Sequence, residues 1–136
     1  MSTQSIKKEQ ELAIEYFEQK LAFETGPIAI SRMIESGEKV QIIDLRTPEL
    51  FAKSHIPGAI NVSYDDLTSY ADKLNPEVPT VVYCYDIVCH LATKAALLLA
   101  KKGYRVRELV GGYDEWVAKK LKAEGTAKAG GSCCNG

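Results

Sequence analysis

The amino-acid sequence predicts a single α/β domain with about five strands in a mainly parallel sheet and helices on both faces. Short apolar segments alternate with helix-like segments along the chain, which is the order expected of such a fold. Two of these segments, 40–44 (VQIID) and 80–84 (TVVYC), are almost continuously apolar, as is typical of buried parallel strands. A chain of 136 residues is long enough for one compact core and too short for two.

The first segments predict helices around a short extended piece. Apolar residues recur at helical spacing over residues 6–24, and Gly26-Pro27 ends that pattern. We expect residues 27–30 to be extended and Ser31 to cap a second helix that ends at Gly37. The first helix is expected to pack on the domain, or, if it stands free, to mark a dimer contact, through Tyr16, Phe17 and Leu21.

The middle of the chain predicts two strands, each followed by a helix. Segment 40–44 is the first of these strands, and Thr47-Pro48 then supplies a cap and a first-turn proline. After a turn at 55–58, residues 59–62 form a short strand. Ser63 with Asp66 resembles a capping box, and the next helix has a buried stripe, namely Leu67, Tyr70, Ala71 and Leu74.

The last third predicts the most β-prone strand, two helices and a tail. Segment 80–84 is rich in β-branched and aromatic residues, and residues 90–102 are strongly helical. Residues 106–110 form another strand, after which Gly111-Gly112 turns into a final helix. The small, polar residues from Gly125 onward predict a flexible tail. We therefore divide the chain into a helical extension (1–25), a domain (26–122) and a Gly/Cys tail (123–136).

Composition and charge exclude several functions. Hydrophobic residues make up 46% of the chain, charged residues 26%, and the net charge is −1. The basic residues form no stripe, so we expect no nucleic-acid partner, and no apolar run is long enough for a membrane span. The N-terminal segment lacks the features of a secretory signal, which predicts a cytoplasmic protein. In that compartment, cysteines are more often catalytic or metal-binding than disulfide-bonded.

Cys84 is the leading candidate for chemistry. It ends the most β-prone segment, and ligands of parallel sheets bind at the carboxyl ends of the strands. Loop N–H groups and the N-terminus of the following helix would stabilise a thiolate there, so we expect a lowered pKa. The alternative is that Cys84 is a small buried strand residue.

Several segments together resemble the rhodanese-like sulfurtransferases. They are 42–62 (IIDLRTPELFAKSHIPGAINV), 81–84 (VVYC) and 109–116 (LVGGYDEW), in the family's order. The N-terminal helix and a second loop cysteine are similar to those of one branch. The resemblance implies a five-stranded parallel sheet and a persulfide-carrying nucleophile at Cys84. The residues to which we assign structural roles are Asp44, Arg46, His55 and Trp116.

The loop after Cys84 departs from the family pattern. We expect the substrate-binding loop to consist of Tyr85, Asp86, Ile87, Val88, Cys89 and His90, and it contains neither the usual Gly nor the usual Arg. An arginine would hold thiosulfate, so we expect thiosulfate to be a poor donor. Cys89 is a candidate resolving or relay thiol facing Cys84; the alternative is a packing residue at a helix start. His90 either tunes a thiol or caps the helix.

Three functions remain open from the sequence. The leading one is transfer of sulfane sulfur through Cys84 from a small donor to a thiol acceptor, which is either a small molecule or a protein. The second is a thiol redox or non-catalytic binding module that uses Cys84 and Cys89. Phosphatase or arsenate reductase chemistry ranks lower because the loop lacks an arginine. No metal or cofactor is required, and Cys133-Cys134 is either a mobile sulfur acceptor or an idle chain end.

Overall fold

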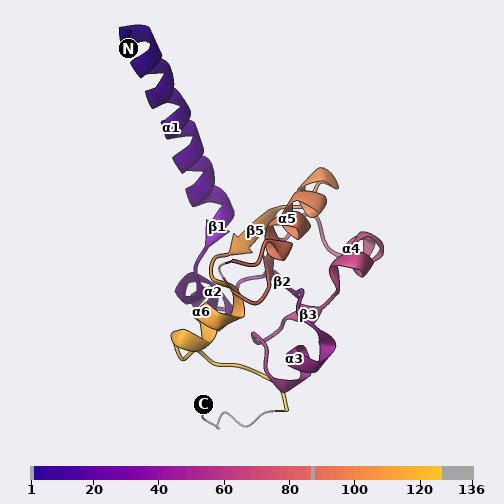
Figure 1. Ribbon diagram of the computed structural model, residues 1–136. Helices are drawn as coiled ribbons and strands as arrows, with labels where there is room; N and C mark the ends of the chain where they lie inside the picture. Colours follow the sequence, from indigo (N-terminus) through magenta and orange to yellow (C-terminus); the bar gives the residue numbers. More distant parts are fainter. Residues whose placement is uncertain (1, 87, 127–136) are drawn as a thin grey trace.

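The computed structural model describes residues 2–86 and 88–126. Its five strands form one parallel sheet in the order β1-β5-β4-β2-β3 (Figure 1). The strands are β1 (Glu24–Thr25), β2 (Gln41–Asp44), β3 (Ile60–Asn61), β4 (Thr80–Tyr83) and β5 (Val106–Leu109). The strand β4 therefore lies at the centre, paired with β2 and β5. This confirms the predicted fold class.

In the described part of the chain six α-helices accompany the sheet, and helices lie on both of its faces (Figure 1). They are α1 (Thr3–Phe23), α2 (Pro27–Glu35), α3 (Pro48–Lys53), α4 (Tyr64–Tyr70), α5 (Leu91–Lys101) and α6 (Gly112–Ala118), and a 3₁₀ turn, Ala71–Lys73, follows α4. The helices α4 and α5 contribute to one buried cluster, and α2 and α6 contribute to the other. The helices α2, α4, α5 and α6 thus bury apolar residues against one side of the sheet or the other.

Side-chain alternation along β4 decides which way the candidate cysteine faces. Val81 and Tyr83 belong to the cluster on the α2/α6 side, whereas Val82 and Cys84 belong to the cluster on the α4/α5 side. Successive side chains of a strand point to opposite faces, so this is the pattern of a strand buried on both sides. The prediction that residues 81–83 are deeply buried is confirmed, since none exposes more than 1% of its surface.

Local capping explains where the helices begin, and it corrects one expectation. Thr47 and Ser63 accept the expected capping bonds from Leu50 and Asp66. The extended piece predicted at 27–30 is wrong, because α2 already begins at Pro27, with Gly26 at the N-cap position. A proline is well suited to the first helical turn, where its missing N–H is not needed. The extended residues are those of β1, just before it.

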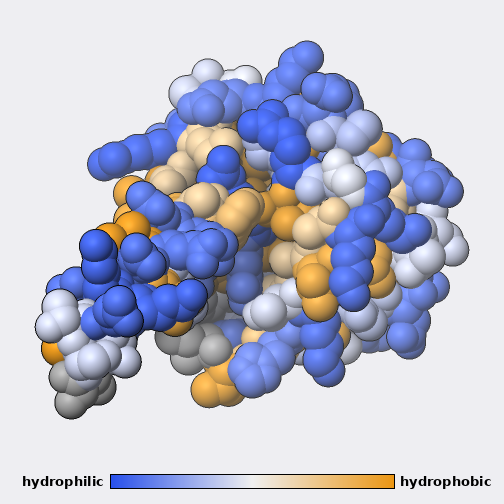
Figure 2. Space-filling model, turned by 90° about the horizontal axis from the view of Figure 1, so that it is seen from above, coloured by the Kyte–Doolittle hydropathy of each residue, from blue (hydrophilic) through white to orange (hydrophobic). Residues whose placement is uncertain are grey.

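The N-terminal helix does not pack on the domain as expected. It stands away from the sheet (Figure 1), and none of its residues is buried. Its C-terminal end is held where β1 pairs with β5 and where Arg107 donates to the Ala22 carbonyl oxygen at 2.7 Å. The protruding arm shows mostly hydrophilic surface in Figure 2, with hydrophobic atoms at its edges. The residues expected to pack are more than half exposed: Tyr16, Phe17 and Leu21.

The chain continues to contact the domain past residue 122, where we expect the domain to end. Glu124 and His55 exchange both backbone hydrogen bonds, at 2.8 and 2.9 Å. The N–H of Thr126 donates to the Ala52 carbonyl oxygen at 2.8 Å. The remainder of the predicted tail, residues 127–136 with Cys133-Cys134, lies outside the described residues. Within the described part of the chain, no helix combines the length and apolar character that a membrane crossing requires.

Candidate active site

Cys84 lies directly after β4, at the carboxyl edge of the sheet, as predicted. Its side chain is 2% exposed. It borders a pocket of about 320 Å³ that also reaches the loop, the start of α5, the end of β5 and the end of α1. The residues that line this cysteine pocket are Lys20, Glu24, Cys84, Asp86, Cys89, His90, Ala92, Thr93, Glu108, Leu109, Val110, Gly111 and Gly112.

The loop brings Cys89 against Cys84. Their Sγ atoms lie 2.6 Å apart, and both cysteines are free thiols. Asp86 curls the loop, because its carbonyl oxygen accepts from the Cys89 N–H at 3.3 Å and its Oδ1 accepts from the Val88 N–H at 3.1 Å. The predicted proximity of the two thiols is therefore present in the structure, and little movement separates this pair from a disulfide.

The predicted lowering of the Cys84 pKa is wrong for this conformation. Burial, followed by the hydrogen bond with Cys89, raises the pKa of the Cys84 thiol to about 12, while the Tyr85 N–H opposes this. The N–H groups of Val88 and Cys89 donate to Asp86, as described above, so they do not stabilise the sulfur. A neutral, unreactive thiol is the resting form that this arrangement favours.

This pKa shift predicts how the thiols react with iodoacetamide. Alkylation of Cys84 should be slow at pH 7 and should rise through pH 10, because only the thiolate reacts. Cys89→Ala removes a hydrogen bond that raises the pKa of Cys84, so alkylation of Cys84 in this variant should begin at lower pH than in wild type. The measurement is modification against pH, with mass-spectrometric fragmentation between the two cysteines. A wild-type profile with its midpoint below pH 8 would contradict the raised pKa.

The start of α6 anchors the backbone on which the cysteine sits. The N–H groups of Tyr113 and Asp114 donate to the carbonyl oxygens of Cys84 and Tyr85, each at 2.9 Å. Gly112 makes this approach possible, because a Cβ there would lie 2.8 Å from the Cys84 carbonyl oxygen. The strand-to-helix turn therefore needs a glycine for contact as well as for its positive φ.

Asp44 and Arg46 form a buried ion pair that supports the neighbouring strand ends, as their predicted structural role requires. The Asp44 carboxylate accepts from Arg46 Nε and Nη2 at 2.9–3.2 Å and from Tyr83 Oη at 2.5 Å. The guanidinium also lies over the Tyr113 ring, 4.0 Å from its centre, and donates to the Ser54 carbonyl oxygen. Arg46 is thus held by Asp44 and Ser54 and does not line the cysteine pocket.

His55 and Trp116 also occupy packing positions. The His55 ring stacks on Phe51 with 3.7 Å between ring centres, and its Nδ1 contacts the Phe51 carbonyl oxygen at 2.6 Å. Trp116 is 1% exposed, and its Nε1 donates to the Lys122 carbonyl oxygen at 2.9 Å. Neither residue lines the cysteine pocket.

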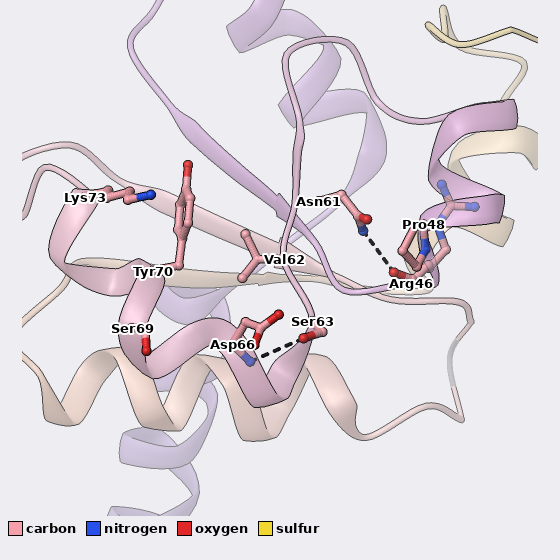
Figure 3. Close-up of a pocket in the computed structure, with 9 residues that line it drawn as sticks. All are labelled: Arg46, Pro48, Asn61, Val62, Ser63, Asp66, Ser69, Tyr70 and Lys73. Atoms are coloured by element: carbon pink, nitrogen blue, oxygen red, sulfur yellow. Dashed lines mark hydrogen bonds between the residues drawn. The ribbon is translucent and has the colours of Figure 1, made fainter.

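A second pocket lies between the ends of β2 and β3 and helix α4, and it lacks a nucleophile. Figure 3 shows Asn61 donating to the Arg46 carbonyl oxygen, Ser63 capping α4 through Asp66, and Tyr70 beside Lys73. Of the two pockets, only the one beside Cys84 offers thiol chemistry.

The remaining loop residues and the pocket walls add findings that the sequence analysis missed. His90 occupies the N-cap position of α5 but its side chain makes no capping bond. Tyr85 packs against the α4/α5 cluster, and Ile87 lies outside the described residues. The polar pocket residues outside the predicted site are Lys20, Glu24, Thr93 and Glu108. The strand order, with β5 between β1 and β4, brings Lys20, Glu24 and Glu108 to this edge, whereas Thr93 lies in the first turn of α5.

The chain belongs to the rhodanese-like domain family, whose model matches residues 27–119. Among solved structures, the BH2092 protein from Bacillus halodurans is 33% identical, with a TM-score of 0.80, and the match covers 86% of this chain and 87% of that one. Residues 26–136 make up less than 86% of the chain, so the matched part must also include residues of α1.

Two relatives show how the family is used elsewhere. The thiosulfate sulfurtransferase GlpE of Coxiella burnetii is 31% identical over 80 residues, which span 58% of this chain and 73% of that protein. The HTH-type transcriptional regulator Rv0324 of Mycobacterium tuberculosis is 32% identical over 99 residues. That match covers 73% of this chain but 43% of the regulator, so it concerns one part of a larger protein.

Proposed function

We propose that this chain is a sulfurtransferase that carries sulfane sulfur as a persulfide on Cys84 and passes it to a thiol acceptor. The observation that supports this most is the Cys84–Cys89 thiol pair in a pocket at the carboxyl end of β4. The family includes named sulfurtransferases such as the Coxiella burnetii relative.

The proposed cycle has two balanced steps. Cys84 sulfur attacks the outer sulfur of a donor persulfide, the donor S–S bond breaks, and the departing thiolate takes the proton that Cys84 loses. An acceptor thiolate then attacks the outer sulfur of the Cys84 persulfide, forms a new persulfide and returns Cys84 as a thiolate, which regains a proton. Neither step requires an oxidant.

The donor preference follows from the charges available in the pocket. Among its described lining residues there is no arginine, and Arg46 is held by Asp44. Thiosulfate loses the charge-assisted bonds that would stabilise departing sulfite. We expect kcat/KM for thiosulfate to be roughly ten- to a hundredfold below that of an arginine-bearing relative, on the scale of one lost charged hydrogen bond, and we expect glutathione persulfide to be preferred over thiosulfate. Steady-state assays with both donors test this, and equal values would contradict the preference.

Thiol redox chemistry is the second candidate function, and the 2.6 Å contact between the two sulfurs favours it. Intact mass separates the two functions after incubation with glutathione persulfide. A gain of about 32 Da marks a persulfide, whereas a loss of about 2 Da marks a Cys84–Cys89 disulfide. A protein that shows the loss with oxidants and never the gain is a redox module.

Cys89 is proposed to act on the persulfide after it forms. Its thiolate can attack the inner sulfur, which gives a Cys84–Cys89 disulfide and releases hydrosulfide. Wild-type protein loaded with polysulfide should therefore release sulfide without added thiol, and Cys89→Ser should keep its persulfide at least about tenfold longer. Sulfide release is followed with a fluorescent probe. Equal rates in the two proteins, with no disulfide in the mass spectrum, would make Cys89 a packing residue.

A further inference from the structure

The wall of the cysteine pocket carries more negative than positive charge. Lys20 Nζ binds both carboxylate oxygens of Glu24, at 2.8 and 2.9 Å, so these two charges offset each other. Glu108 and Asp86 add two further carboxylates to the lining. No ion pair within the described residues involves either of them. The pocket therefore has a surplus of two negative charges when His90 is neutral.

Both surplus carboxylates are held in place rather than left free to turn away. Glu108 lies on β5, beside β4, and its Oε2 accepts from Thr93 Oγ1 at 2.8 Å. Asp86 lies two residues after Cys84, and its Oδ1 accepts from the Val88 N–H. The β5 carboxylate and the loop carboxylate thus line the same pocket as the two sulfurs. Like charges that share a pocket repel an anionic reactant and attract a cationic one.

We infer that Asp86 and Glu108 select the thiol partner of Cys84, and that the preferred partner carries a positive charge close to its sulfur. This inference rests on the proposed sulfur transfer and adds the chemical class of the acceptor. Two sources share that chemistry: a small aminothiol, and a protein cysteine flanked by lysine or arginine. Acidic thiols are disfavoured by the same carboxylates.

Three acceptors of nearly equal size isolate the effect of charge: cysteamine, 2-mercaptoethanol and 3-mercaptopropionate, which are cationic, neutral and anionic. The protein is loaded with polysulfide, desalted and mixed with each acceptor at pH 8 under low salt, and persulfide loss is followed by intact mass. The measured quantity is the rate of persulfide loss with cysteamine divided by the rate with 3-mercaptopropionate. Coulomb energies at pocket distances predict that this ratio is about 5- to 30-fold higher in wild type than in Asp86→Asn/Glu108→Gln. The double variant supplies the intrinsic reactivity of each thiol.

Two controls keep the result interpretable. Asp72→Asn/Glu77→Gln makes the same charge change on exposed residues away from the pocket and should keep the wild-type ratio. In wild type, salt near 1 M should compress the ratio, because screening weakens exposed charges. This second readout holds even where the double variant does not fold. Acetylated Lys-Cys-Lys and Glu-Cys-Glu peptides extend the series, and a larger charge effect for the peptides than for the small thiols points to a protein acceptor.

The outcomes separate the inference from the proposed function. In one outcome, the protein takes up sulfur and transfers it to all three acceptors, with the same ratios in wild type and the double variant and with no salt effect. That outcome overturns the charge selection and leaves sulfur transfer standing. Failure of wild type to take up sulfur at all overturns both. A ratio that is altered equally by the distant control variant also overturns the assignment to Asp86 and Glu108.

Discussion

Replacing Cys84 with serine is expected to abolish sulfur transfer, with kcat/KM falling by at least about a hundredfold. A serine hydroxyl cannot hold sulfane sulfur, and its oxygen is a far weaker nucleophile than a thiolate. The residue sits in a well-packed position, 2% exposed, and serine is close to cysteine in size. The loss should therefore appear in activity while the thermal unfolding midpoint changes little. Donor consumption and persulfide mass are the two measurements.

A matched variant controls for the other thiols of the chain. Cys133→Ser/Cys134→Ser removes two cysteines and keeps both Cys84 and Cys89, so it should form the persulfide at the wild-type rate. If Cys84→Ser protein still gains sulfur, the receiving thiol is one of the other cysteines, Cys89 first among them because its Sγ lies 2.6 Å from that of Cys84, and the assignment of the nucleophile is wrong.

Gly112→Ala is expected to disrupt the site through the start of α6, which contacts the backbone of Cys84. The new Cβ would lie 2.8 Å from the Cys84 carbonyl oxygen and 2.9 Å from the Asp86 nitrogen, so the backbone around the cysteine has to move. The positive φ of 60° adds about 1–2 kcal/mol for a residue with a side chain. We expect a loss of about 2–4 kcal/mol in unfolding free energy, since overpacking adds to the backbone strain. Transfer activity should fall at least about tenfold because the loop is displaced.

Gly58→Ala is the matched control for backbone strain. Gly58 has φ of 82°, yet a Cβ there meets nothing within 4 Å. Its cost should stay near the strain alone, about 1–2 kcal/mol, with activity preserved. Urea unfolding and transfer assays on both variants give the comparison. Equal stability losses and equal activities would show that close contact at Gly112 is unimportant.

The central strands, and the order of strands and helices along the chain, follow from local signals in the sequence. Segments 40–44 and 80–84 are mostly apolar because both faces of β2 and β4 are covered, and this composition marks them as buried strands. The strand β1 spans two residues, which is too short for any periodicity. Its position depends on pairing with β5, far away in the chain. The start of α2 was misplaced because Gly26-Pro27 indicates a helix end as readily as a helix start.

The nucleophile and its neighbouring thiol were predictable, but their electrostatics were not. Cys84 and Cys89 are five residues apart, and a tight loop after a strand brings such residues together. The raised pKa depends on where the loop N–H groups point, and Asp86 takes two of them. Likewise, Lys20 and Glu108 are brought to the pocket by strand order alone. The position of α1 was mispredicted, because an apolar stripe indicates that one face of a helix can be buried but does not indicate which surface buries it.

Locating transferred sulfur within a single turnover tests the central claim most directly. Wild-type protein is loaded from a persulfide labelled with heavy sulfur, trapped by alkylation and digested with trypsin. Both loop cysteines fall in one peptide, residues 74–94, so fragmentation between them assigns the label. We expect the label on Cys84 first, and then on an added acceptor thiol as the sulfur leaves the protein. Label that arrives only on Cys89, or that never reaches an acceptor, would contradict a Cys84 persulfide as the carrier.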